Sequence, residues 1–304
     1  MFSGRTGAAR LSIVIVVGLI IVKVVVGTIT GSLSVLAQAV DSFLDLFAVS
    51  ITFLAIHVAA KPADEEHPFG HGKAENVAAI VQAALIFIAG GVIIYQAIRR
   101  AQTEAALSMT EAGIGVMAAS IIASIFLSRY LRRVAKKEDS AALEASAHNI
   151  AADVYSAAAG FIGLIVVRIT SLHIIDDILA GIVALFIIKV SIDILRKSFG
   201  GLVDVKLPEA EEKKIELAIT EHFDGEVVSF HKLRTRKAGP QRYIDLHLVM
   251  PRHVSIEEAH QMCDHLEKDI RHRLIRTDVT IHVEPCDGTC AACKITCDER
   301  KTEN

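Results

Sequence analysis

Long apolar stretches fill the first two thirds of the chain, and they limit its fold more than any other feature. A helix needs about 20 mostly apolar residues to cross a bilayer core roughly 30 Å thick, within a range of about 17 to 25. Six stretches meet or nearly meet this length: Leu11–Thr30, Leu33–His57, Val77–Ile98, Thr110–Leu131, Ala141–Val167 and Asp176–Leu195. We therefore predict an α-helical membrane bundle of six transmembrane helices within residues 1–203.

The cations that flank these stretches predict the orientation of the bundle. Six is an even number, so both termini lie on the same side of the bilayer. Placing them in the cytoplasm puts most flanking lysines and arginines inside, while Arg99, Arg100 and Arg168 lie outside. The positive-inside rule thus predicts a multi-pass protein of the inner (plasma) membrane with both termini cytoplasmic. A net charge of -3 over 304 residues gives no indication of nucleic-acid binding.

Two aspartates interrupt the second apolar stretch, in the segment QAVDSFLDLFAVSITFLAI. An Asp at the centre of a membrane helix costs about 2.5 to 3.5 kcal/mol, so Asp41 and Asp45 are expected to have a function. At positions i and i+4 they share one helix face, where joint ionisation requires a nearby cation. That partner is either a bound metal ion or a structural group, such as polar side chains on another helix or a buried Lys23.

A second polar pair lies in the fifth stretch, in EASAHNIAADVYSAAAG. Asn149 and Asp153 are again four residues apart. Two helices that each present two oxygen ligands can form a four-ligand cage at membrane depth, and three carboxylates with an amide suit a hard or borderline divalent cation. His148 points about 100° away from Asn149 on a regular helix and would join only through a distortion. Protons and metal compete for the same carboxylates, which predicts proton coupling.

A polar loop, AAKPADEEHPFGHGKAEN, separates the second and third stretches. Asp64, His67 and His71 lie three and four residues apart, and the neighbouring Pro and Gly residues argue against a long helix. A carboxylate and two imidazoles at this density favour a tetrahedral metal site, the alternative being a solvated loop with incidental histidines.

The second part of the chain, residues 204–285, is predicted to be a small cytoplasmic α/β domain with the order α-β-β-α-β. PEAEEKKIELAITEHF has helical spacing, and EVVSFHKLRTR and QRYIDLHLVM alternate as strands around the predicted Ala238-Gly239-Pro240 turn. SIEEAHQMCDHLEKDIRHRLI opens with a Ser255-to-Glu258 capping box, and DVTIHVEP reads as a third strand. His231, His247 and His282 fall on the three strands, Glu284 on the same strand face as His282, and His260 on the second helix.

Residues 286–304 form a tail that contains CDGTCAACKITC. Cys286, Cys290, Cys293 and Cys297 lie in a reducing location, so disulfides are not expected. Four thiolates in one segment are able to hold Zn, Cd, Fe or an iron–sulfur cluster, and a tail without a metal is the alternative. Cys263, on the second helix, is interpreted as a buried thiol.

The segments DSFLD, DEEHPFGHGKAE, NIAAD, FHKLRTRKAGPQRYIDLHLVM, EEAH and IHVEP, in this order, resemble the cation diffusion facilitator family. The resemblance covers about residues 11–285. It implies a homodimeric efflux carrier that exchanges a cytoplasmic divalent metal for protons, with no organic cofactor, and a ferredoxin-like cytoplasmic domain.

The resemblance also implies roles for individual residues. The transport site would be Asp41, Asp45, Asn149 and Asp153; a loop site would use Asp64, His67 and His71; and His231, His247, His260, His282 and Glu284 would bind metal near the dimer interface. Lys73 would pair with Asp204 to link the two domains. Zinc-preferring members usually have His where Asn149 stands, so the all-oxygen set favours Mn, while the full set of cytoplasmic ligands favours Zn or Fe; Co and Cd also remain open.

Two other classes of function fit the sequence less well. A membrane metallohydrolase needs an open metal position and a base, but the chain has no His-Glu-x-x-His motif and its cage offers no nucleophile. A membrane metal sensor would need the cytoplasmic site but not acidic pairs on two membrane helices. We therefore predict a transporter, not an enzyme.

Overall fold

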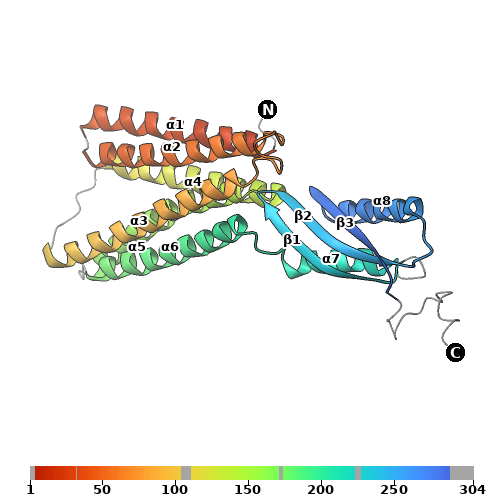
Figure 1. Ribbon diagram of the computed structural model, residues 1–304. Coiled ribbons are helices and arrows are strands. Elements are labelled where there is room, and N and C mark those ends of the chain that lie inside the picture. Colours follow the sequence, from red (N-terminus) through yellow and green to blue (C-terminus); the bar gives the residue numbers. More distant parts are fainter. Residues whose placement is uncertain (1–3, 32, 104–110, 171–173, 223–226, 288–304) are drawn as a thin grey trace. The chain divides into compact units, whose positions relative to one another are not determined.

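The computed structural model describes residues 4–31, 33–103, 111–170, 174–222 and 227–287. The chain divides into two compact units, Met1–Leu202 and Val203–Asn304. Figure 1 shows helices in the first unit and a small sheet with two helices in the second.

The first unit consists of long helices packed side by side. Its described residues form six helices: α1 (Gly4–Thr30), α2 (Leu33–Ala59), α3 (Ala74–Thr103), α4 (Glu111–Glu138), α5 (Ala141–Thr170) and α6 (Ile174–Leu202). Four described stretches are long and apolar enough to cross a membrane: Gly4–Thr30, Gln38–Ala59, Ala74–Arg99 and Ile178–Leu202. The helices α4 and α5, of 28 and 30 residues, also have the length to cross a bilayer.

The corner between α4 and α5 shows why the chain reverses there. Lys136 and Lys137 lie in the last turn of α4, where cations interact favourably with the helix dipole. Asp139 then adopts a φ of 56°, the left-handed conformation that commonly ends a helix. The hydroxyl of Ser140 accepts the Leu143 N–H at 3.3 Å and caps the start of α5.

A glycine allows α3 and α6 to approach closely. A Cβ atom at Gly90 would lie 2.7 Å from Cγ1 of Ile188 and 3.3 Å from the Ala184 carbonyl oxygen. Ile86 on α3 and Ile187 on α6, each 1% exposed, belong to the hydrophobic cluster around this contact. The lack of a side chain at Gly90 therefore lets the two helices pack closely.

The second unit has the predicted order of elements. Its described elements are α7 (Glu209–Thr220), β1 (Ser229–Ala238), β2 (Gln241–Met250), α8 (Ile256–Arg273) and β3 (Thr277–Pro285). In the sheet order β1-β2-β3, β1 and β2 are antiparallel and β2 and β3 are parallel. Gly239, with a φ of 58°, and Pro240 form the tight turn between β1 and β2, as the sequence predicted. The predicted capping box is also confirmed, since Ser255 and Glu258 bond reciprocally at the start of α8.

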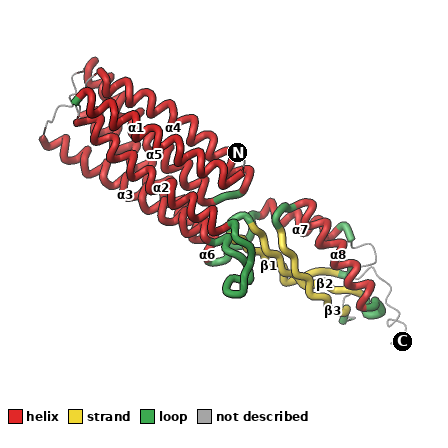
Figure 2. Tube along the Cα trace, turned by 90° about the horizontal axis from the view of Figure 1, so that it is seen from above, coloured by secondary structure: helices red, strands yellow, loops and turns green. Residues whose placement is uncertain are grey.

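One face of this sheet is covered by both helices, as Figures 1 and 2 show. Alternate residues of β2 are buried, among them Ile244, Leu246 and Leu248. They form one core with Ile215 of α7 and Leu266 of α8. Because successive strand residues point to opposite faces, the residues between them, such as His247, lie on the face away from the helices.

A β-bulge distorts β1 next to that open face. The register between β1 and β2 shifts between His231 and Arg234, and Lys232 has a φ of 51°. Bulges of this kind redirect side chains and are common beside functional sites. Here the bulge immediately follows a predicted metal ligand.

Candidate functional site

Carboxylates from the two predicted polar pairs meet between α2 and α5. The carboxyl groups of Asp45 and Asp153 lie within hydrogen-bonding reach of each other, and Asp41 lies close enough to interact electrostatically with both. Asn149 lies one turn before Asp153 on α5. The carboxylates that the sequence assigned to one cage are thus neighbours in space.

A lysine from α1 adjoins this acidic group. Lys23 is 9% exposed, and its ammonium donates to the Ser42 hydroxyl at 2.7 Å and to the Gln38 carbonyl at 3.5 Å. Its charge interacts with those of Asp41, Asp45 and Asp153. Lys23 therefore places an amino group beside the three carboxylates, as expected if a buried lysine is their structural partner.

His148 has a different set of charged neighbours. These are Arg132, Glu144 and Lys197, on α4, α5 and α6. None of them belongs to the acidic group around Asp45. This environment agrees with the 100° offset that separates His148 from Asn149 on a regular helix.

The loop after α2 brings its three predicted ligands together. Ligand atoms of Asp64, His67 and His71 all lie within 4.8 Å of one another. Asp64 accepts the His67 backbone N–H at 2.7 Å, and its other carboxylate oxygen lies 3.4 Å from Nε2 of His71. The His67 backbone bond, followed by the His67 ring contact, lowers the pKa of Asp64. Gly70 helps to close the loop with a φ of 73°.

Three histidines form a row across the open face of the sheet. His231 pairs in register with His247, and His247 with His282. Glu284 connects them: its carboxylate lies 2.6 Å from Nδ1 of His247, 3.1 Å from Nε2 of His231 and 3.9 Å from Nε2 of His282. The bond from His247 is the main cause that lowers the pKa of Glu284. Ligand atoms of His231, His247 and Glu284 lie within 4.8 Å of one another, a geometry suited to a borderline divalent ion.

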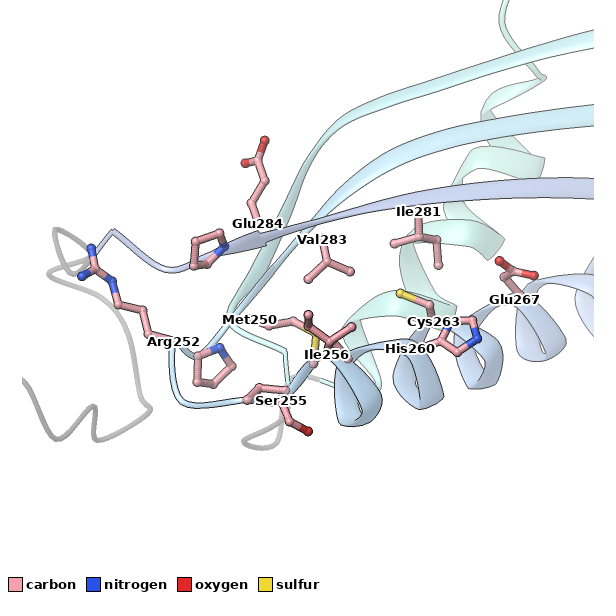
Figure 3. Close-up of a pocket in the computed structure, with 14 residues that line it drawn as sticks. Met250, Arg252, Ser255, Ile256, His260, Cys263, Glu267, Ile281, Val283 and Glu284 are labelled. Carbon is pink, nitrogen blue, oxygen red and sulfur yellow. The ribbon is translucent and has the colours of Figure 1, made fainter.

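His260 lies on the other side of β3. It lines a pocket of about 410 Å³ between α8 and β3, together with Cys263, Ile281 and Val283. Figure 3 shows His260 and Cys263 on the helix side, whereas the Glu284 side chain points to the opposite face. Within one chain the structure therefore does not bring His260 to the histidine row, and its predicted role as a ligand stays a prediction.

The remaining predicted residues give partial information. Cys286 is 3% exposed, and its N–H donates to the Met250 carbonyl at 2.8 Å, which extends β3. Cys290, Cys293 and Cys297 lie outside the described residues. Lys73 donates to the Leu202 carbonyl at 3.1 Å, and Asp204 lies 3.6 Å from Nη1 of Arg236. The predicted pairing of Lys73 with Asp204 would connect the two units and stays a prediction.

Sequence reasoning missed a buried carboxylate at the start of α3. Glu75 is fully buried; it accepts from Arg5 of α1 at 2.5 Å and from the hydroxyl of Ser140, the residue that caps α5. It also missed a group of two histidines and an aspartate, His222, His265 and Asp269. The i, i+4 spacing of the last two was visible in the sequence, but their proximity to His222 was not.

Comparisons with known proteins agree with this architecture. Residues 9–203 match the cation efflux transmembrane domain, and residues 207–286 match the cytoplasmic domain of cation efflux proteins. An uncharacterised transporter of Synechocystis is 31% identical over 259 residues, which cover 85% of this chain and 83% of that protein. The cation-efflux pump FieF of Salmonella typhi is 33% identical over 268 residues, 88% of each chain, and its counterpart in Salmonella paratyphi A is 32% identical over the same shares.

The family match covers more than half of the chain, and these relatives are aligned along most of their length. Divalent metal ions as transported substrates fit both this family and the acidic and histidine groups described above. The chain belongs to the cation efflux, or cation diffusion facilitator, family of membrane metal transporters, and it is not an enzyme.

Proposed function

We propose that this transporter exports divalent transition-metal ions from the cytoplasm in exchange for protons, with Mn(II) preferred. It would act as a homodimer in the inner membrane, with six spans and both termini cytoplasmic. Residues 204–285 would form a ferredoxin-like cytoplasmic domain that pairs across a twofold axis. Asp41, Asp45, Asn149 and Asp153 would bind the transported ion.

The proximity of the Asp45 and Asp153 carboxyl groups, which lie within hydrogen-bonding reach of each other, is the main support for this function. Two carboxyl groups share a hydrogen bond only when one of them carries a proton, because an ionised carboxylate is an acceptor only. A dication that binds between them displaces that proton. Metal and proton would therefore occupy the same place in turn, and alternating exposure to the two sides would couple their movements.

The position of Lys23 beside the three carboxylates supports the same exchange. A metal-free site with three carboxylates has a large excess of negative charge at membrane depth. Lys23 offsets part of this excess from its position beside Ser42. One bound proton and one ammonium would then lower the net negative charge of the empty site from three to one, which would make it easier for the site to change orientation without a metal.

The preference for manganese depends on Asn149. An amide oxygen with three carboxylates forms an all-oxygen set, which suits Mn(II) better than zinc, for which imidazole and thiolate are favourable ligands. The histidine row of the cytoplasmic unit supports the alternative that Zn, Fe or Cd is exported. Metal bound there, by His231, His247, His282 and Glu284 with His260, would draw two cytoplasmic domains together.

Flux into proteoliposomes tests the proposal. Purified protein is reconstituted into vesicles, and Mn, Zn, Fe, Co or Cd is added on one side of the membrane. Each metal is tested with and without an imposed pH gradient. We expect Mn(II) flux that rises when protons flow in the opposite direction, and a shift toward Zn(II) in Asn149→His. Flux that did not change with the pH gradient would contradict proton exchange. If Asn149→His transported the metals with the same order of preference as wild type, Asn149 would not determine the metal selectivity.

A further inference from the structure

A second cytoplasmic ligand group lies where α7 and α8 meet, on the helix side of the sheet. His222 follows the end of α7, while His265 and Asp269 lie one turn apart on α8. Their ligand atoms all lie within 4.8 Å of one another. The histidine row lies on the opposite face of the sheet, so the two groups cannot share an ion within one chain.

The orientation of His222 is fixed in the way that metal-binding histidines usually require. Its Nδ1 lies 2.8 Å from the Ala218 carbonyl oxygen, which only accepts, so Nδ1 is the donor. A carbonyl that holds one ring nitrogen sets the tautomer and leaves the lone pair of the other free for a metal. That nitrogen, Nε2, faces Asp269 at 3.5 Å.

The rings and charges around the site also permit an ion. The His222 and His265 rings meet edge to face, with centroids 5.1 Å apart. The His222 side chain is 16% exposed and that of Asp269 32%, so water has access to complete the coordination. Ligands of tetrahedral zinc lie about 3.3 Å apart for bonds of about 2.0 to 2.1 Å, a distance that small side-chain rotations reach from the observed geometry.

A neighbouring ion pair holds the two ligand-bearing segments in place. Arg273, near the end of α8, donates to both carboxylate oxygens of Glu221, at 2.5 and 3.1 Å. Glu221 directly precedes His222, and Arg273 lies one turn after Asp269. This forked contact positions the end of α7 against α8 whether or not an ion is present.

We propose that His222, His265 and Asp269 form a metal site for a borderline divalent ion of the zinc class, with water as the fourth ligand. Two imidazoles and one carboxylate favour such an ion over the harder Mn(II). The site is separate from the transport cage and from the histidine row. A bound ion would fasten the end of α7 to α8 and stabilise the folded cytoplasmic unit by mass action.

Zinc stoichiometry of the full-length protein in detergent tests this proposal. Wild type, His265→Gln, Asp269→Asn and the control His272→Gln are equilibrated with Zn(II) by dialysis, and bound zinc per chain is measured by mass spectrometry. His272 is an exposed histidine on the same helix that is not part of the group. We expect both ligand variants to bind about one zinc fewer per chain, or to bind it at least about tenfold more weakly, while the control equals wild type.

Two further measurements make the result decisive. Thermal unfolding without metal identifies any variant that fails to fold; Asp269→Asn keeps the shape of the side chain and decides the outcome if His265→Gln is unstable. A transport-site variant, Asp45→Asn/Asp153→Asn, is expected to keep this zinc, so failure of the transport proposal leaves the new site testable. If Asp269→Asn bound as much zinc as wild type, the proposal would be overturned. The contact between His222 and Asp269 in wild type would then be an ion pair without a metal-binding role.

Discussion

The carboxyl groups of Asp45 on α2 and Asp153 on α5 lie within hydrogen-bonding reach of each other, although 108 positions separate them in the chain. This contact closes the acidic group between two helices that are each apolar along most of their length. Both carboxyls are therefore expected to be necessary for metal transport.

Asp45→Asn and Asp153→Asn should each reduce metal flux by about 100-fold or more. Loss of a residue that merely supports a ligand costs about 10- to 100-fold in metal affinity, so loss of a ligand itself costs at least as much. Asp193→Asn is the matched control, because it removes an exposed carboxylate from α6 outside the acidic group. Flux is measured in proteoliposomes; near-normal transport by either variant would contradict the assigned site.

Replacement of Lys23 by Met should tighten metal binding by about tenfold, which corresponds to about 1.4 kcal/mol of removed charge repulsion. The ammonium interacts with the same three carboxylates that would receive the dication. Lys23→Arg keeps the charge and is expected to stay close to wild type. Competition with a chelating dye measures the affinity in detergent, and equal affinities of Lys23→Met and wild type would show that Lys23 acts only through packing.

The histidine row should control metal-dependent association of the cytoplasmic domains. His247→Gln removes the residue that bonds Glu284 at 2.6 Å in the middle of the row. We expect about tenfold weaker zinc-dependent association, measured by energy transfer between labelled chains of the proposed dimer. His253→Gln, an exposed histidine in the loop before α8, serves as the control; equal responses of the two variants would exclude the row as the regulatory site.

The cap of α8 predicts a pH dependence of stability. Hydrogen bonds from the backbone and hydroxyl of Ser255 lower the pKa of Glu258 below its ordinary value of 4.5. A lowered pKa means that the cap stabilises the fold fully above pH 4.5 and loses this effect as the pH falls through the lowered pKa. Thermal unfolding should therefore separate wild type from Glu258→Gln at neutral pH, with the gap closing in acid. Glu257→Gln, in the same turn, should show a smaller gap, and Ser255→Ala should cost about 1 kcal/mol.

Gly90→Ala should destabilise the membrane unit. The added Cβ would lie 2.7 Å from Ile188 and 3.3 Å from the backbone oxygen of Ala184, so α3 and α6 would have to separate. Overpacking of this kind typically costs about 1 to 3 kcal/mol. Gly91→Ala is the control, since no atom lies within 4 Å of its Cβ position. Detergent melting curves that do not distinguish the two variants would contradict a tight α3–α6 contact.

Local spacing in the sequence was sufficient to predict much of the architecture. The alternation of β2 and the capping box at Ser255 depend on neighbours within a few residues, and the structure confirms both. Asp64, His67 and His71 were similarly accessible, because a short loop holds its own ligands together.

Features that depend on contacts between distant segments could not be predicted in this way. The bulge after His231 leaves no clear sequence signal, because Lys232 is not a glycine although its φ is positive. His222 precedes His265 by 43 positions, and only the packing of α7 beside α8 brings them together. The sequence also did not show on which side of the sheet His260 lies, because that depends on which face α8 packs against.

The contact between Arg5 and Glu75 has a practical consequence for engineering the amino-terminal end. Glu75 has no exposed surface, and Arg5 is the cation that meets its carboxylate. Deleting the first five residues would leave an uncompensated buried charge where α3 begins, and the loss of one partner of such a pair typically costs about 3 to 5 kcal/mol. Shortened versions of this protein should therefore keep Arg5.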